Sequence, residues 1–199
     1  MLSFLKVAVL SLLLGLSPLS PAAAKETAPL DAKADALKPG QFLWEPGRAT
    51  GGPVEIVISL GLQRAYVYRG GTLIGVSTVS SGRTGHESPV GRFQILEKRK
   101  VHRSNRYNDA PMPFMQRLTW RGVALHAGEI PGRPASHGCI RLPAKFAQSL
   151  FEATSVGSSV FIADEKFASA KQALDMARFH ASVPLNADRS PVRQAGLAP

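Results

Sequence analysis

Runs of hydrophobic residues in the middle of the chain predict a series of β-strands. The segment VEIVISL (54–60) is β-branched and apolar, QRAYVY (63–68) alternates, and TLIGVSTVSSG (72–82) follows a group of turn residues. This pattern is typical of successive antiparallel strands joined by tight turns. The same criteria predict further strands at 92–100, 114–120, 122–128 and 158–164.

The sequence also predicts two helices, one inside the domain between its last two predicted strands and one beyond the domain. Phe146, Leu150 and Phe151 recur at helical intervals within 143–153, and residues 166–181 are rich in Ala, Gln, Met and Leu. The predicted fold class is therefore mostly β, with one internal helix and one C-terminal helix.

The segments that flank the predicted domain have a different composition. Residues 25–52 read as a linker up to Pro39, followed by an approach segment that packs on the domain. The domain itself is expected to span 53–164, with a polar loop or flap at 101–113. Residues 165–199 are expected to form the C-terminal helix and a disordered tail.

The first residues of the chain have the organisation of a secretory signal peptide. Lys6 precedes an apolar run at 7–16, and Ala22-Ala23-Ala24 follows two prolines. We therefore predict a signal peptide at 1–24, cleaved after Ala24, and a protein exported across the inner membrane to the periplasm or cell wall. The alternative, an uncleaved membrane anchor, would need about 20 apolar residues.

The chain is basic. It has 24 Lys and Arg against 14 Asp and Glu, a formal net charge of +10. A positive surface favours anionic surroundings such as wall polymers, lipid headgroups or nucleic acid. Export makes nucleic acid the least expected partner, and the chain has no Lys/Arg block with interleaved aromatic residues.

Cys139 is the only cysteine. A secreted disulfide scaffold needs paired cysteines, so this thiol is incidental, intermolecular or reactive. A neighbouring imidazole, from His126 or His137, can take the thiol proton or hold a thiolate–imidazolium pair. The backbone N–H groups of Gly138 and Cys139, near the start of the predicted helix, are candidates for an oxyanion hole. Arg141 has the right charge to help them and to grip a substrate carboxylate.

These residues are recognisable as a group. HAG (126–128) followed by SHGCIRL (136–142) resembles the signature of the L,D-transpeptidase (YkuD) catalytic domain family. Upstream, SPVGRF (88–93) resembles the family's Thr-Pro-x-Gly-x-Phe segment, with Ser for Thr, and MPF (112–114) resembles its Met-Pro-aromatic element. The resemblance covers residues 53–164.

The resemblance implies a β-sandwich fold and a peptidoglycan substrate, with no cofactor. In this family the cysteine attacks a diaminopimelate-containing stem peptide at the bond between the L-centre of diaminopimelate and the terminal D-residue, and forms a thioester. An amine of another stem then gives a 3→3 crosslink. Carried over by position, Cys139 is the nucleophile, His126 the base, and the Ala127 carbonyl the group that orients it. The remaining positions would orient the oxyanion (Gly138, His137) or hold substrate (Arg141, Ser136).

Several alternatives stay open from the sequence. The acceptor of the acyl group is another stem peptide, an outer-membrane protein or water, and water would make the protein a carboxypeptidase or endopeptidase. The loop between His126 and Ser136 is short, which bears on the acceptor. A zinc site of His126, His137 and Cys139 with His86 or His102, and an idle wall-binding module, are rival interpretations. A carbapenem, whose ring a thiolate can open, is expected to be a covalent inhibitor.

Overall fold

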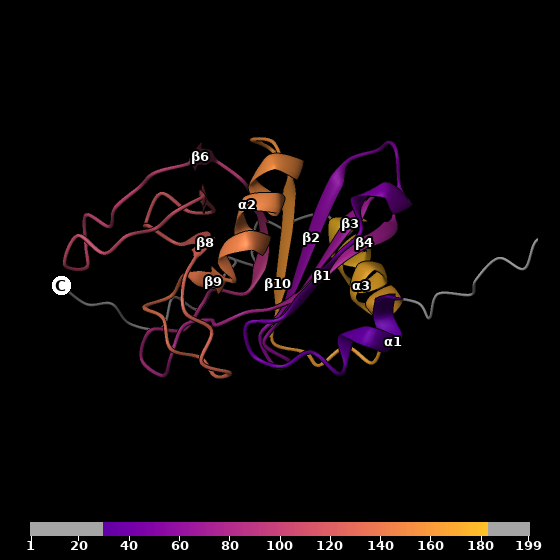
Figure 1. The fold of residues 1–199 in the computed structure, drawn as a ribbon, viewed down its shortest axis with the longest axis horizontal. Coiled ribbons are helices and arrows are strands. Elements are labelled where there is room, and N and C mark those ends of the chain that lie inside the picture. Colours follow the sequence, from indigo (N-terminus) through magenta and orange to yellow (C-terminus); the bar gives the residue numbers. More distant parts are fainter. Residues whose placement is uncertain (1–29, 183–199) are drawn as a thin grey trace, which may run out of the picture.

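The computed structural model describes residues 30–182, which form a mostly β structure with two sheets, as predicted (Figure 1). The strands of the larger sheet are, in chain order, β1 (Phe42–Trp44), β2 (Val54–Ser59), β3 (Arg64–Arg69), β4 (Thr72–Thr78), β5 (Gly91–Gln94) and β10 (Ser159–Ala163). The smaller sheet consists of β6 (Glu97–Arg99), β7 (Met115–Arg117), β8 (Ala124–Ala127) and β9 (Ile140–Leu142). The helices are α1 (Leu30–Ala34), the short 3₁₀ helix η1 (Pro46–Arg48), α2 (Ala144–Ala153) and α3 (Ala170–Ser182).

The larger sheet has the strand order β1-β4-β3-β2-β10-β5, and the smaller one β6-β7-β8-β9. The predicted antiparallel meander is present as β2, β3 and β4. Two pairings, β2 with β10 and β8 with β9, are parallel instead. Strand β9 lies inside the SHGCIRL segment, where no strand was predicted.

The strand predicted at 92–100 is two strands that belong to different sheets. Strand β5 pairs with β10, whereas β6 pairs with β7. The chain changes sheet at the residues between them: Ile95 N–H donates to Ser158 at 3.0 Å, and Leu96 N–H donates to Arg117 at 2.8 Å. Because the sequence stays strand-like throughout, its pattern could not reveal this transfer.

The segment expected to be a linker is in part a folded element. Leu30 and Ala34 of α1 are buried, and the carboxylate of Asp31 accepts a hydrogen bond of 3.0 Å from the Ala170 N–H at the start of α3. Strand β1, in the predicted approach segment, adds to the edge of the larger sheet beside β4. The residues from Leu30 onward are thus part of the folded body, which corrects the linker interpretation for them.

Two predictions fall outside the described residues: the signal peptide at 1–24 and the tail beyond the C-terminal helix. The helix predicted at 166–181 is α3 and begins four residues later. Between residues 30 and 182, no helix is long and apolar enough to cross a membrane.

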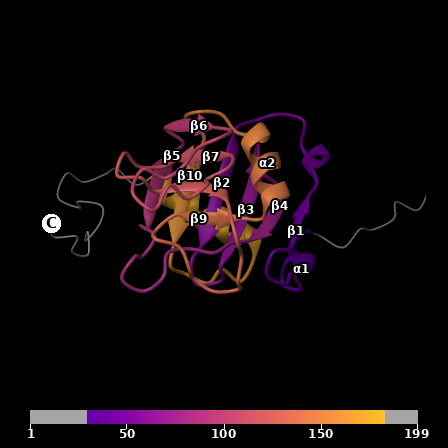
Figure 2. The ribbon, with the colours of Figure 1, turned by 60° about the vertical axis from the view of Figure 1, so that its left-hand side comes forward.

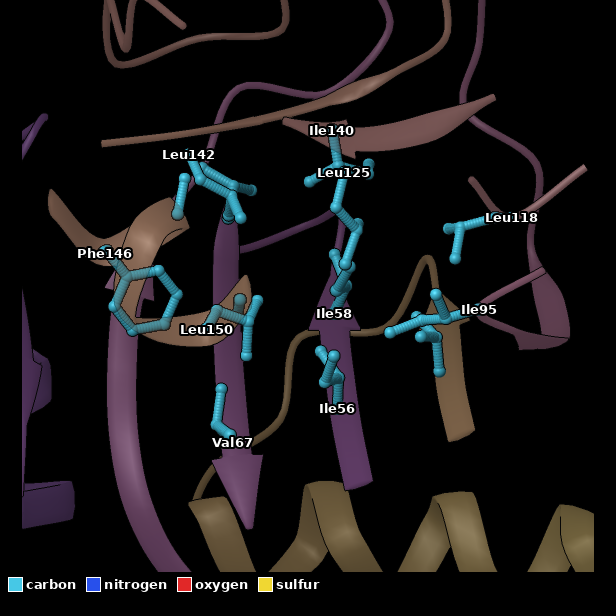
Figure 3. Close-up of a cluster of buried hydrophobic side chains, with 14 of the residues drawn as sticks. Ile56, Ile58, Val67, Ile95, Leu118, Leu125, Ile140, Leu142, Phe146 and Leu150 are labelled. Atoms are coloured by element: carbon cyan, nitrogen blue, oxygen red, sulfur yellow. The ribbon is translucent and has the colours of Figure 1, made fainter. Parts of the chain in front are cut away.

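The main core lies between the two sheets and α2 (Figure 3). It contains side chains from the larger sheet (Ile56, Ile58, Val67), the smaller sheet (Leu125, Ile140, Leu142) and α2 (Phe146, Leu150). The opposite face of the larger sheet is covered by α3, through a second cluster that includes Val57, Tyr66 and Leu174. Burial on both faces explains why β2 reads as a continuous apolar run.

The smaller sheet lies on the opposite side of the molecule from α1 (Figures 1 and 2). Its inner face contributes to the core, and its other face carries His126 and Arg141.

Candidate active site

The parallel pairing of β8 with β9 brings the two parts of the signature together. Leu125 lies opposite Ile140, and His126 lies opposite Arg141. Leu125 and Ile140 point into the core. Because side chains alternate along a strand, His126, Arg141 and, two positions earlier, Cys139 belong to the other face of the sheet.

That face borders a cavity of about 1560 Å³. All seven residues expected to form the site line it: His126, Ala127, Ser136, His137, Gly138, Cys139 and Arg141. The predicted flap at 101–113 contributes another part of the wall, as do Ser88 and Pro89. The fold therefore gathers one potential reaction chamber from four separate parts of the sequence.

His126 has a defined tautomer. Its Nδ1 lies 2.8 Å from the carbonyl oxygen of Ala127. A carbonyl only accepts, so Nδ1 carries the proton and Nε2 presents a lone pair. Burial lowers the pKa of His126 to about 4; the positive charges of Arg141 and His102 act in the same direction, and the hydrogen bond to Ala127 opposes them. The ring is therefore neutral at pH 7 and able to accept a proton.

The thiol of Cys139 is also neutral in this surrounding. It packs against the buried cluster of Met112, Met115 and Ala124, and its Sγ donates to the Gly122 carbonyl at 3.5 Å. Burial raises the thiol pKa above its ordinary value, against the opposing effects of the Ala124 N–H and of Arg141 and Arg117. Of the two arrangements left open by the sequence, these pKa directions favour a neutral thiol and imidazole at rest over a preformed ion pair.

The protonation state of the Cys139 thiol can be tested with a small electrophile. Iodoacetamide reacts with the thiolate, so alkylation of Cys139 should accelerate about tenfold for each pH unit between about pH 6 and 8. Rates measured by intact-mass spectrometry across this range would show the slope. A rate that is already constant from pH 6 upward would mean a preformed thiolate and would contradict this arrangement.

Ser136 holds the turn that presents the thiol. Its Oγ accepts from the Gly138 N–H at 3.0 Å and donates to the Cys139 carbonyl at 2.5 Å. From the other side, the Ser88 hydroxyl donates to the Gly138 carbonyl at 2.9 Å. Ser136 is buried, so these contacts favour a positioning role over the substrate-binding role expected from the resemblance. Ser88, which sequence reasoning did not single out, has a related role, and the signal for it was its place in the SPVGRF segment.

The prediction that the oxyanion hole lies near the start of a helix is wrong about the helix. Helix α2 begins at Ala144 with Pro143 as its N-cap, so strand β9 separates the helix from Cys139. The Gly138 N–H is already engaged by Ser136. The physical reason is that the apolar Ile140 and Leu142 are buried in the core by strand pairing before the helix can begin.

Gly138 is required by its backbone conformation. Its φ is +110°, a region that residues with a side chain rarely adopt, whereas an added Cβ would meet nothing closer than 3.7 Å. Replacing Gly138 with alanine should therefore destabilise the protein by about 1–3 kcal/mol, measured by urea unfolding. Gly47, with negative φ and open space around its Cα, is the matched control, and Gly47→Ala should change stability little. Equal effects of the two substitutions would contradict the explanation.

His137 is exposed, and its ring is engaged outside the reaction centre. Its Nε2 lies 2.8 Å from the Arg83 guanidinium, which only donates, so Nε2 is the acceptor. The ring stacks on Tyr107 of the flap at 4.5 Å and meets His86 edge-on at 4.9 Å. Because its ring is engaged in these contacts, His137 is not placed to act as the base for Cys139, and it lies at the rim of the cavity.

The zinc alternative needed several of these side chains around one point. Within residues 30–182, no group of three or more His, Cys, Asp or Glu side chains is placed to hold a metal ion. The proposed ligand His137 is instead held by Arg83 and Tyr107.

Arg141 presents a charge to the cavity. Its backbone is fastened to Ser80 by two hydrogen bonds of 2.9 and 3.1 Å, and its side chain packs over Gly128. None of the ion pairs formed within residues 30–182 includes Arg141. The simple alternative of a structural salt bridge is therefore not realised in this part of the chain, and the guanidinium remains suited to an anionic ligand.

Solved structures resemble this fold. A crystal structure of an L,D-transpeptidase from Mycobacterium tuberculosis has 25% sequence identity and a TM-score of 0.54, covering 57% of this chain and 59% of that one. An L,D-transpeptidase from Mycobacterium smegmatis has 24% identity and a TM-score of 0.53, with 57% and 60% covered. LD transpeptidase LdtMt1 in complex with imipenem has 25% identity and a TM-score of 0.52, with 57% and 60% covered.

This chain thus spans about three fifths of the length of those structures. No curated protein sequence matches it significantly. The family profile described as YkuD, L,D-transpeptidase catalytic domain, matches residues 53–162, which is more than half of the chain. With the fold and the signature residues in agreement, this protein belongs to the L,D-transpeptidase (YkuD) catalytic domain family.

Proposed function

We propose that this protein is an exported transpeptidase that acts on peptidoglycan stem peptides through a thioester on Cys139. The observation that carries the proposal is the arrangement of His126: its Nδ1 is fixed on the Ala127 carbonyl, and its ring lines the same cavity as the thiol. This leaves Nε2 as the basic atom. The signal peptide at 1–24 would direct the enzyme to the periplasm or cell wall.

In the first half-reaction, His126 Nε2 takes the proton of Cys139 as the sulfur attacks the carbonyl carbon of the diaminopimelate L-centre. A tetrahedral intermediate forms. The imidazolium then gives its proton to the nitrogen of the terminal D-residue, the C–N bond breaks, and a thioester remains. Because burial keeps both partners neutral at rest, the proton is transferred as the sulfur attacks the carbonyl and not before.

In the second half-reaction, an acceptor attacks the thioester. When the acceptor is the side-chain amine of another diaminopimelate, His126 removes its proton, the C–S bond breaks, and the thiolate recovers a proton from the imidazolium. The product is a 3→3 crosslink. Water in place of the amine would yield a shortened stem peptide, and an amine of a protein would attach that protein to the wall.

Incubation with purified tetrapeptide muropeptides and mass analysis of the products tests the proposal. Crosslinked dimers together with the released terminal residue are expected for transfer. Shortened monomers alone would make the hydrolytic alternative the correct one. Intact donor after prolonged incubation would overturn the proposal.

A carbapenem should react with the same thiol. The support comes from LdtMt1, whose structure was determined in complex with imipenem. Imipenem is a strained cyclic amide, so attack by Cys139 opens the ring without a leaving group, and the mass of the wild-type protein should rise by the whole mass of the drug. Intact-mass spectrometry checks this result. An unmodified wild-type protein after long incubation would count against an accessible nucleophile.

A further inference from the structure

The segment of the chain that forms most of the cavity wall is rich in basic residues. Residues 83–141 contain eleven Lys and Arg but four Asp and Glu, whereas the other parts of the chain contain thirteen and ten. The cavity is lined by four arginines (Arg106, Arg117, Arg121 and Arg141) and by three carboxylates (Glu87, Glu129 and Asp164). The arginines that are not paired with a carboxylate can attract and orient anionic ligands.

Arg106 extends from the flap over the turn beside the thiol. Its guanidinium donates to the Arg121 carbonyl at 2.6 Å, and its Cδ lies 3.6 Å from the place where a Cβ of Gly122 would be. Gly122 is the residue whose carbonyl accepts from Cys139 Sγ. The exposed guanidinium has five donors and forms no ion pair within the described part of the chain.

The flap holds Arg106 in this position by contacts on both sides of it. Arg103 and Asp109 form an ion pair of 2.5 Å across the flap. The next residue, Tyr107, stacks on His137 of the Cys139 loop. The side chain of Arg106 therefore projects from a folded loop that is fastened to the site.

Arg141 lines the same cavity from a different element of the fold. It lies opposite His126 in the sheet, on the face that carries Cys139, and its charge influences the pKa of both residues. Arg106 contacts the β7–β8 turn at Gly122, whose carbonyl accepts from Cys139, whereas Arg141 belongs to β9. Arg106 and Arg141, neither of which forms an ion pair with the described residues, thus line the cavity that contains the thiol.

We propose that Arg106 and Arg141 recognise two carboxylates of the acyl donor, one on each side of the scissile bond, and select stem peptides that carry both as free acids. The inference rests on the proposed function. The donor has one carboxylate on the terminal D-residue, beyond the bond that breaks, and one on the D-centre of diaminopimelate, on the side of the attacked carbonyl. Guanidinium pairs with carboxylates in a bidentate geometry that a carboxamide cannot reproduce. Arg106 is in this scheme a specificity-determining residue.

The test compares three tetrapeptide donors of the same sequence: the free diacid, the amide at the diaminopimelate D-centre, and the amide at the terminal residue. Acyl-enzyme formation is followed by rapid-quench mass spectrometry. The wild type should acylate with the diacid about tenfold faster than with either amide. Arg106→Gln and Arg141→Gln should each slow the diacid about tenfold, and each should remove the discrimination at one of the two amide positions.

Arg133→Gln is the matched control, because Arg133 is exposed and does not line the cavity; this variant should behave as the wild type. Arg106→Lys keeps the positive charge but loses the bidentate geometry of the guanidinium. This variant should retain part of the discrimination between the diacid and the amides. Equal wild-type rates on the diacid and the amides would overturn this inference and leave the proposed function intact. So would an equal slowing of all three donors by Arg106→Gln. Failure of the wild type to acylate with any donor would overturn the proposed function and the inference together.

Discussion

Replacing Cys139 with alanine is expected to abolish acyl-enzyme formation, with a loss of at least about 10³-fold in the rate of release of the terminal D-residue. The physical reason is that the sulfur forms the covalent bond to the acyl group, and no other cysteine exists in the chain. The neighbouring side chains around the thiol, Met112 and Met115, offer no replacement nucleophile. Stopped reactions with tetrapeptide donor, analysed for free terminal residue and for protein mass, measure the loss.

Two controls separate chemistry from folding in this experiment. Cys139→Ser keeps the shape and the hydrogen-bonding capacity of the side chain, and should be as defective as Cys139→Ala because a hydroxyl is far less acidic than a thiol. Urea unfolding of both variants should give stabilities close to that of the wild type, since the thiol contributes only its contact with a small cluster. A Cys139→Ala protein that still releases the terminal residue at the wild-type rate would show that the nucleophile is another group.

Replacing His126 with alanine is expected to slow acylation by about 10²–10⁴-fold, the usual contribution of a general base. His126 has the geometry of such a base because Nδ1 is tied to Ala127 and Nε2 remains basic. His102 provides the matched control: it also lines the cavity, and burial also lowers its pKa. His102→Ala should retain the rate to within about threefold, since the sequence and structure give His102 no place in the proton transfer. Similar losses in the two variants would reassign the base.

The pH dependence of wild-type acylation offers a second readout for His126. The pKa of its ring is lowered to about 4, so the neutral, basic form persists as the pH falls well below the ordinary histidine value. Acylation should therefore stay nearly constant from about pH 8 to pH 5 and decline as the pH passes through about 4. The rate of alkylation by iodoacetamide should instead fall steeply as the pH is lowered from about 8, because that reaction depends on the fraction of Cys139 present as thiolate. A midpoint of acylation near pH 6.5 would show that the ring is solvated and not buried as described.

The sequence by itself determined the chemical identity of the site. The resemblance of HAG and SHGCIRL to a family signature, together with the single cysteine of the chain, led to the seven residues that line one cavity. The β-branched and alternating runs also determined the central strands, as the β2–β3–β4 meander illustrates. These properties are local: strand preference and motif residues are carried by a few adjacent positions, so they can be read without knowing what lies across the sheet.

The tertiary structure alone decided how those residues meet and which groups each one contacts. Alternation along 92–100 is the same whether the strand stays in one sheet or transfers to a second one, and only pairing partners distinguish the two cases. The parallel alignment of β8 with β9 likewise depends on long-range contacts, and it places Cys139 and His126 on one face. The Gly138 N–H donates a hydrogen bond to the Ser136 hydroxyl in the turn, and no spacing rule could reveal this contact. Burial, which sets the neutral state of the His126 and Cys139 pair, is a property of the packed body: the same two side chains in an extended chain would have ordinary pKa values.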